Sequence, residues 1–178
     1  MPAPADLLTL ARLGAAAMMP IAMSRGGTFP VLLWLVAIGT DFADGRVARR
    51  LGGGTDRGAL LDPVADVAFI LAAFVPAAAW GHVSWLVPGA ILASVVRYGV
   101  AMARARPRGL GREPARSRVG HAAGVVNYAG VGVLVAAMAW PKSLASPCLP
   151  VAALVIVVVN LGAVAERSVR RQLARGAT

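Results

Sequence analysis

Four aspartates lie close together in an otherwise apolar part of the chain: Asp41, Asp44, Asp62 and Asp66. The first two are three residues apart and the last two are four apart, so on helices each pair projects from one face. Ionisable groups inside a membrane cost roughly 2.5 to 3.5 kcal/mol each on insertion scales and usually serve a function with a defined partner. The spacing therefore predicts a functional cluster of carboxylates.

Carboxylates gathered at one point repel one another and need cations between them. A glycine-rich turn at 51–55 brings the two segments that carry them side by side, which lets all four converge. Oxygen ligands select Mg²⁺ or Mn²⁺ rather than zinc, because this segment lacks His and Cys. A pair of such ions suits displacement at a diphosphate. The carboxylate farthest along the second helix is then placed to accept the proton of a hydroxyl nucleophile.

The same aspartates also have a purely structural interpretation, as helix caps and interfacial ion pairs with nearby arginines. Those arginines are Arg46, Arg49, Arg50 and Arg57. Caps explain one or two acids but not four at these spacings, so a metal site is the favoured prediction.

The segment from 41 to 66 fits the pattern D-x2-D-G-x2-A-R-x8-G-x3-D-x3-D at every fixed position. This pattern is the signature of the CDP-alcohol phosphatidyltransferases, and the chain resembles that family. The resemblance implies that Asp41, Asp44 and Asp62 are ligands of a two-metal centre. It implies that Asp66 is both a metal ligand and the catalytic base.

The resemblance also implies how the donor substrate is bound. Gly45, Ala48 and Gly58 are small, which lets the cytidine nucleotide lie against helix backbone. Arg49 is expected to meet the diphosphate, for which a forked, always-charged donor is suited. The implied reaction transfers a phosphatidyl group from CDP-diacylglycerol to a small alcohol and releases CMP. Members of the family are commonly homodimers, so a homodimer is expected here too.

Arginines outside the motif indicate the acceptor alcohol. Arg97 interrupts an apolar segment, so it is expected to face the bundle interior and to bind an anion. With Arg116 and Arg118 it is predicted to hold the phosphate of an acceptor such as glycerol 3-phosphate or inositol phosphate. The alternatives are an ion pair between Arg97 and a motif aspartate, and a solvated loop face for the other two arginines.

Short segments of the chain resemble family members that use different acceptor alcohols. Residues 4–12 are similar to the P-N-x-L-T-x-x-R opening of phosphatidylglycerophosphate synthases, with Asp6 where Asn is usual and Arg12 at the last position. Residues 52–55 resemble members that use inositol phosphate, and residues 44–49 resemble phosphatidylserine synthases. Glycerol 3-phosphate is the favoured acceptor, with inositol phosphate, serine or another lipid as alternatives.

The elements that must hold these residues are predicted to be membrane helices. Of the 178 residues 58% are hydrophobic and the mean hydropathy is +0.69, which is too apolar for an ordinary soluble domain. Segments long enough to approach or cross ~30 Å of hydrocarbon lie at 7–24, 29–50, 57–80, 83–104, 119–141 and 148–166. The sequence predicts an all-α integral membrane protein, one domain over residues 1–178, built as a bundle of six transmembrane helices.

The distribution of charge predicts which way the site faces. The net charge is +10, and the arginines cluster in three places: in the turn within the motif, at 104–118 and in the C-terminal tail. By the positive-inside rule both termini and the active site face the cytoplasm from a plasma or inner membrane. Segment 104–118 is interpreted as a topology determinant in preference to a direct contact with an acidic substrate. The basic residues flank apolar segments without interleaved aromatics, so the lipid bilayer is the expected partner and nucleic acid is not.

A single cysteine, Cys148, lies at the edge of the last apolar segment. Without a second cysteine it forms no disulfide within the chain. Free cysteines commonly behave as small apolar residues, and we expect Cys148 to be a buried, inert thiol.

Two other classes of membrane protein use acidic residues. A UbiA-like prenyltransferase binds metal and diphosphate through Asp-rich motifs, but its usual chain is longer and its second motif lies several helices away. A divalent-cation transporter or binding protein is expected to carry acids on several separated helices, whereas these occupy two adjacent segments. A transporter also leaves Gly45, Ala48 and Arg49 unexplained. Both classes therefore rank below the transferase.

Overall fold

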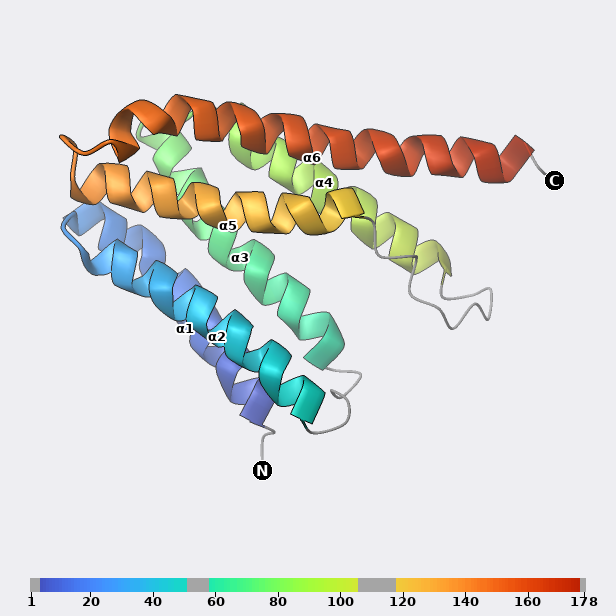
Figure 1. The fold of residues 1–178 in the computed structure, drawn as a ribbon, viewed down its shortest axis with the longest axis horizontal. Helices are drawn as coiled ribbons and strands as arrows, with labels where there is room; N and C mark the ends of the chain where they lie inside the picture. Colours follow the sequence, from blue (N-terminus) through green and yellow to red (C-terminus); the bar gives the residue numbers. More distant parts are fainter. Residues whose placement is uncertain (1–3, 51–57, 106–117, 177–178) are drawn as a thin grey trace.

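The computed structural model describes residues 4–50, 58–105 and 118–176, some of them near helix ends by backbone alone. These residues form six helices: α1 (Pro4–Arg25), α2 (Phe29–Arg50), α3 (Gly58–Ala79), α4 (Leu86–Ala105), α5 (Arg118–Ala139) and α6 (Ala145–Gly176) (Figure 1). The prediction of an all-α fold is confirmed for the described part of the chain.

The helices differ in how well they suit a membrane. In the described residues three are long and apolar enough to cross it, at Leu7–Arg25, Val119–Ala139 and Ala145–Glu166. Where side chains of the other three helices are described, their apolar parts are shorter, at Phe29–Ala43, Pro63–Ala79 and Leu86–Ala101. Three spans are thus supported, and the count of six stays a prediction.

Glycines make the short connections between antiparallel helices. Gly26 and Gly27 join α1 to α2 with φ values of +70° and +77°, and Gly81 follows α3 with φ of +79°. Residues with a Cβ rarely adopt this left-handed conformation, so glycine is needed at these turns. The turns between α1 and α2, α3 and α4, and α5 and α6 all lie at the left of Figure 1.

The bundle is held by two sets of helices that share a core. α1 packs against α2 and α3, while α6 packs against α4 and α5. α5 also contacts α2 and α3, and so connects the two sets. The core between them contains large, fully buried apolar side chains, among them Met19, Phe69, Phe74, Leu134 and Ile156.

A buried amide pair joins α5 to α6. Asn160 Nδ2 donates hydrogen bonds of 2.8 Å to Asn127 Oδ1 and of 2.8 Å to the Ile156 carbonyl oxygen. Asn160 is 1% exposed, so both donors of its amide are satisfied inside the bundle. Polar pairs of this kind hold membrane helices in register, where the hydrophobic effect between helices is weak.

The last segment matches its predicted apolar span, at Ala145–Glu166, but the helix is longer than that span and the expectation of a buried Cys148 is wrong. α6 continues from Ala145 to Gly176, well past residue 166, and its 32 residues reach about 48 Å at 1.5 Å per residue. The apolar pattern ends where the basic tail begins, but arginine and glutamate are good helix formers and the helix continues through them. Cys148 is exposed rather than buried, because it lies on the first turn of α6.

Candidate active site

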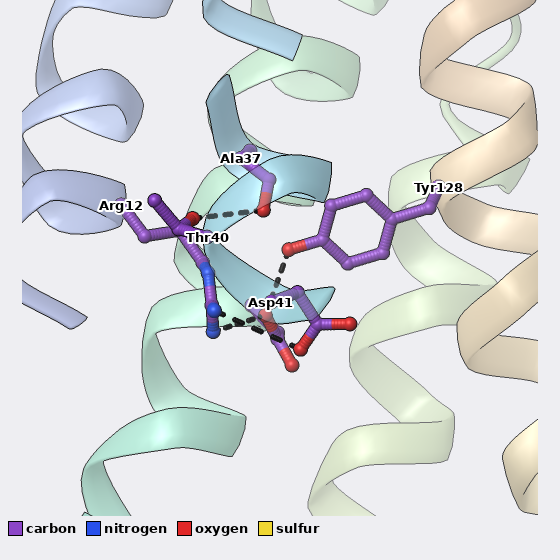
Figure 2. A network of polar contacts seen from close by, with 6 residues as sticks. Arg12, Ala37, Thr40, Asp41 and Tyr128 are labelled. Carbon is purple, nitrogen blue, oxygen red and sulfur yellow. Dashed lines mark hydrogen bonds and ion pairs between the residues drawn. The ribbon is translucent and has the colours of Figure 1, made fainter. Parts of the chain in front are cut away.

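A buried arginine joins two of the motif aspartates. Arg12 lies on α1, and its side chain is 0% exposed. Its Nη1 donates a 2.8 Å hydrogen bond to Asp66 Oδ1 on α3, and its Nη2 lies 3.7 Å from Asp41 Oδ1 on α2. Figure 2 shows the guanidinium beside the Asp41 carboxylate. The packing of α1 against both α2 and α3 makes this three-helix contact possible.

The two carboxylates differ in environment. The Asp41 side chain is 56% exposed, whereas that of Asp66 is 30% exposed. The ion pair with Asp41 is long and largely open, so it contributes little to stability. The short, charge-assisted hydrogen bond to Asp66 is the stronger of the two. Asp66 is therefore the better fixed of these acids.

A tyrosine from α5 completes the surroundings of Asp66. The Tyr128 hydroxyl donates a 2.7 Å hydrogen bond to Asp66 Oδ1, the same oxygen that Arg12 contacts. The tyrosine ring stacks on Phe69, with 5.9 Å between ring centroids and 13° between planes. The Tyr128 carbonyl oxygen accepts a 2.9 Å hydrogen bond from Trp34 Nε1 on α2. Tyr128 is thus held by contacts of its ring, its hydroxyl and its backbone carbonyl group.

The structure places the predicted ligands on the ends of two neighbouring segments. Asp41 and Asp44 lie in the last turns of α2, and Asp62 and Asp66 lie in the first turns of α3. Asp41 and Asp66 both contact Arg12, and convergence of all four aspartates stays a prediction. The side chains of Asp44 and Asp62 lie outside the described ones. Within the described part of the chain, no group of three or more metal-binding side chains is found.

The predicted donor contacts are placed by backbone alone. Gly45, Ala48 and Arg49 lie in α2, one to two turns beyond Asp41, and Gly58 is the first residue of α3. This puts all of them on the same two helices as the aspartates. The side chain of Arg49 lies outside the described ones, so its contact with a diphosphate stays a prediction.

The predicted acceptor arginines are only partly placed. Arg97 Nη2 donates a 2.7 Å hydrogen bond to Ser168 Oγ, which ties α4 to α6. Arg118 begins α5, but its side chain lies outside the described ones, and Arg116 lies outside the described residues altogether. The structure therefore places Arg97 on the α4–α6 contact and leaves the acceptor pocket as a prediction.

Sequence reasoning did not assign roles to Arg12 and Tyr128. A signal for Arg12 was present, because a charged residue on an apolar helix must find a partner, and Arg12 closes the opening run at 4–12. Tyr128 belongs to no motif. The one available signal was a single phenol in an apolar helix, whose hydroxyl needs an acceptor when buried.

The chain was compared with known proteins. A family model described as CDP-alcohol phosphatidyltransferase matches residues 3–163, which is most of the chain. A search of curated proteins found no match. The matched range contains the aspartate motif, Arg12 and Tyr128.

Proposed function

This chain belongs to the CDP-alcohol phosphatidyltransferase family, whose model matches residues 3–163, and from this membership we propose its reaction. The chain is therefore an enzyme of phospholipid synthesis that transfers a phosphatidyl group from a CDP-alcohol. We infer that the donor is CDP-diacylglycerol, that the acceptor is a small alcohol and that CMP is released.

One observation supports this reaction more than any other. Asp41 from α2 and Asp66 from α3, the first and last acids of the motif, meet at the buried guanidinium of Arg12. A helix-cap function does not require acids from two helices to converge. Convergence is what a site for a polyanionic donor and its counterions requires.

The donor atoms present fit a hard divalent cation. Asp41 and Asp66 offer carboxylate oxygens that are partly exposed, and Asp44 and Asp62 lie on the same two helix ends. We infer that these four aspartates hold Mg²⁺ or Mn²⁺, as a pair of ions. When bound, the pair would neutralise the diphosphate and stabilise the departing CMP.

The remaining chemistry is a proton transfer and a displacement. We infer that Asp66 accepts the proton of the acceptor hydroxyl, whose oxygen then bonds to the phosphatidyl phosphorus. The bond from that phosphorus to the oxygen of CMP breaks, and CMP leaves with the electron pair. Gly45, Ala48 and Gly58 would give the nucleotide room against the helices, and Arg49 would hold its diphosphate.

The acceptor and the assembly complete the proposal. Arg97, Arg116 and Arg118 would bind the phosphate of an acceptor, for which glycerol 3-phosphate is our first choice. Arg97 supports this because it is a half-buried cation whose partner in the described part of the chain is a neutral serine hydroxyl. We further propose a homodimer that crosses the membrane several times, with its site on the cytoplasmic side.

The test is release of CMP by the purified full chain. We expect CMP only when CDP-diacylglycerol, an alcohol and Mg²⁺ or Mn²⁺ are all present. In a panel of glycerol 3-phosphate, inositol phosphate, inositol, serine and glycerol, the phosphorylated alcohols should be used best. Asp62→Asn should abolish turnover without unfolding the protein. Full turnover in excess EDTA would contradict the metal, and a better rate with an unphosphorylated alcohol would contradict the arginine pocket.

A further inference from the structure

Two helices that do not carry the motif both reach the carboxylate of Asp66. Arg12 on α1 donates to Asp66 Oδ1 at 2.8 Å, and Tyr128 on α5 donates to the same oxygen at 2.7 Å. Figure 2 shows the Tyr128 side chain extending away from its own helix, and the dashed line at its hydroxyl is the hydrogen bond to Asp66. Because one oxygen accepts both hydrogen bonds, rotation of the carboxylate about its Cβ–Cγ bond would break both at once. The contacts therefore fix the orientation of the carboxylate as well as its place.

We propose that Tyr128 is a positioning residue for the reaction: its hydroxyl holds Asp66 in the orientation in which the carboxylate accepts the proton of the acceptor alcohol. The inference rests on the proposed function, in which Asp66 is the base. A base works only when its oxygen lies within hydrogen-bond reach of the proton that it removes, and small misplacements are costly. Tyr128 acts through Asp66 and is not itself required to touch a substrate.

The surroundings of Tyr128 place its hydroxyl firmly. Its ring stacks on Phe69, which is fully buried and lies three residues beyond Asp66 on the same helix. Residues three apart share one face of a helix, so α3 supplies both the carboxylate and the surface on which the ring rests. The hydrogen bond from Trp34 to the Tyr128 carbonyl oxygen ties the same residue to α2. A hydroxyl held in this way can restrict the carboxylate that it contacts.

The roles of Tyr128 and Arg12 can be separated by experiment. Arg12 contacts both Asp41 and Asp66, so its removal disturbs two predicted metal ligands. The Tyr128 hydroxyl donates its hydrogen bond to Asp66. Tyr128→Phe removes that one hydrogen bond while leaving the ring stack and the backbone contact with Trp34 in place. It is therefore the sharper variant.

The first test compares Tyr128→Phe with the wild-type chain in CMP release. We expect kcat to fall about tenfold, the size expected for loss of one hydrogen bond to a charged group, with the KM for CDP-diacylglycerol changed less than about twofold. Tyr98→Phe on α4 is the matched control and should keep the wild-type kcat. An unchanged kcat in Tyr128→Phe would overturn the proposal. So would a parallel loss of kcat and donor affinity, which indicates a general disturbance of the fold.

The second test needs no turnover. The chain has two tyrosines, so in Tyr98→Phe the tyrosine Fermi doublet in ultraviolet resonance Raman spectra reports on Tyr128 alone. We expect the doublet to shift when Asp66→Ala is added, because the phenol then loses its charged acceptor. An unshifted doublet would overturn the proposal. A different result would contradict the proposed function and leave the hydrogen bond intact. In that case the wild-type protein releases no CMP with any alcohol, while the doublet still shifts in the Asp66→Ala variant.

Discussion

Arg12 shows how this chain accommodates a full charge inside an apolar bundle. The side chain is 0% exposed, and burial of an unpaired guanidinium would be strongly unfavourable. Two carboxylates from different helices share it, one through a 2.8 Å hydrogen bond and one at 3.7 Å. The arginine also reduces the repulsion between acids that must lie close together. A single residue on α1 thus allows the motif on α2 and α3 to converge.

We predict that Arg12→Ala destabilises the protein when no divalent metal is present. The hydrogen bond to Asp66 is the main loss, worth about 1.5 to 3 kcal/mol for a contact between charged groups, and the truncated side chain also leaves a cavity. Thermal unfolding of the detergent-solubilised chain in EDTA measures the effect. Arg12→Lys keeps the charge without the fork and should be intermediate. Equal melting of Arg12→Ala and the wild type would contradict this account.

At the residue scale, the sequence predicted a site for the aspartates but did not identify the side chains that contact them. The spacing within each pair, Asp41 with Asp44 and Asp62 with Asp66, predicted which acids share a helix face, and the glycine-rich turn between the pairs predicted that all four converge. The structure shows Asp41 and Asp66 at one arginine. The sequence did not show that Arg12 is their common partner, since an arginine at the start of the chain has several acids within reach. For Tyr128 the sequence offered only a phenol in an apolar helix, without a partner for it. The importance of Tyr128 depends on how α5 packs against α3, which is a tertiary property.

The contact between α2 and α5 depends on a glycine. The indole of Trp34 on α2 lies against Gly132 on α5 so closely that a Cβ at this position would overlap ring atoms. The same indole donates its N–H to the Tyr128 carbonyl oxygen, one turn earlier on α5. Small residues that permit such close approach are common at helix contacts in membranes. This contact links the helix of Asp41 to the helix of Tyr128.

We predict that Gly132→Ala weakens this contact. The indole is rigid and held by its hydrogen bond, so the added methyl group must push the helices apart, at a cost of about 1 to 3 kcal/mol for overpacking. The apparent melting temperature of the purified chain should fall. Gly124→Ala, on the same helix, is the control, because a Cβ there meets nothing within 4 Å, and it should melt at or slightly above the wild-type temperature. Equal effects of the two substitutions would rule out the contact as the cause.

At the element scale the apolar segments predicted every described helix, with ends displaced by a few residues. The exception is α6, whose helix continues ten residues past the end of the predicted apolar segment at 166, to Gly176. Hydropathy locates where apolar character ends, and a helix leaving a membrane need not end there. The basic tail of α6 combines good helix formers with a polar surface. Propensity rather than hydropathy was the relevant signal.

In the whole molecule, the candidate active site and the short connections between paired helices lie at opposite ends of the bundle. The three short turns between paired helices lie together at the left of Figure 1, away from both chain termini. The acids of the motif lie at the end of α2 and the start of α3, on the side of the termini. In the sequence, the arginines at 104–118 and in the tail follow α4 and the apolar part of α6, and the C-terminal ends of these two helices lie on this same side (Figure 1). In a membrane, the arginine-rich segments and the aspartate motif would therefore lie on the same side of the bilayer.

We predict from this arrangement that Cys148 lies on the side of the membrane opposite the motif. The thiol is the only one in the chain, is exposed and lies on the first turn of α6, next to the turn from α5. By the positive-inside rule the basic end is cytoplasmic, so the start of α6 should face outward. A membrane-impermeant maleimide should then label Cys148 in sealed right-side-out vesicles. Cys148→Ala should abolish this labelling.

The reciprocal variant completes the topology test. In Cys148→Ala carrying Thr178→Cys, we expect the new thiol to be labelled only after the vesicles are permeabilised. The reverse pattern would place the basic arginines and the aspartate site outside, against the charge rule and away from the cytidine nucleotides of the cytoplasm. Labelling of both thiols in sealed vesicles would mean that α6 does not cross the membrane. The result therefore decides whether the chain crosses the membrane an odd or an even number of times between residues 148 and 178. It also decides whether the proposed donor can reach Asp66 from the cytoplasm.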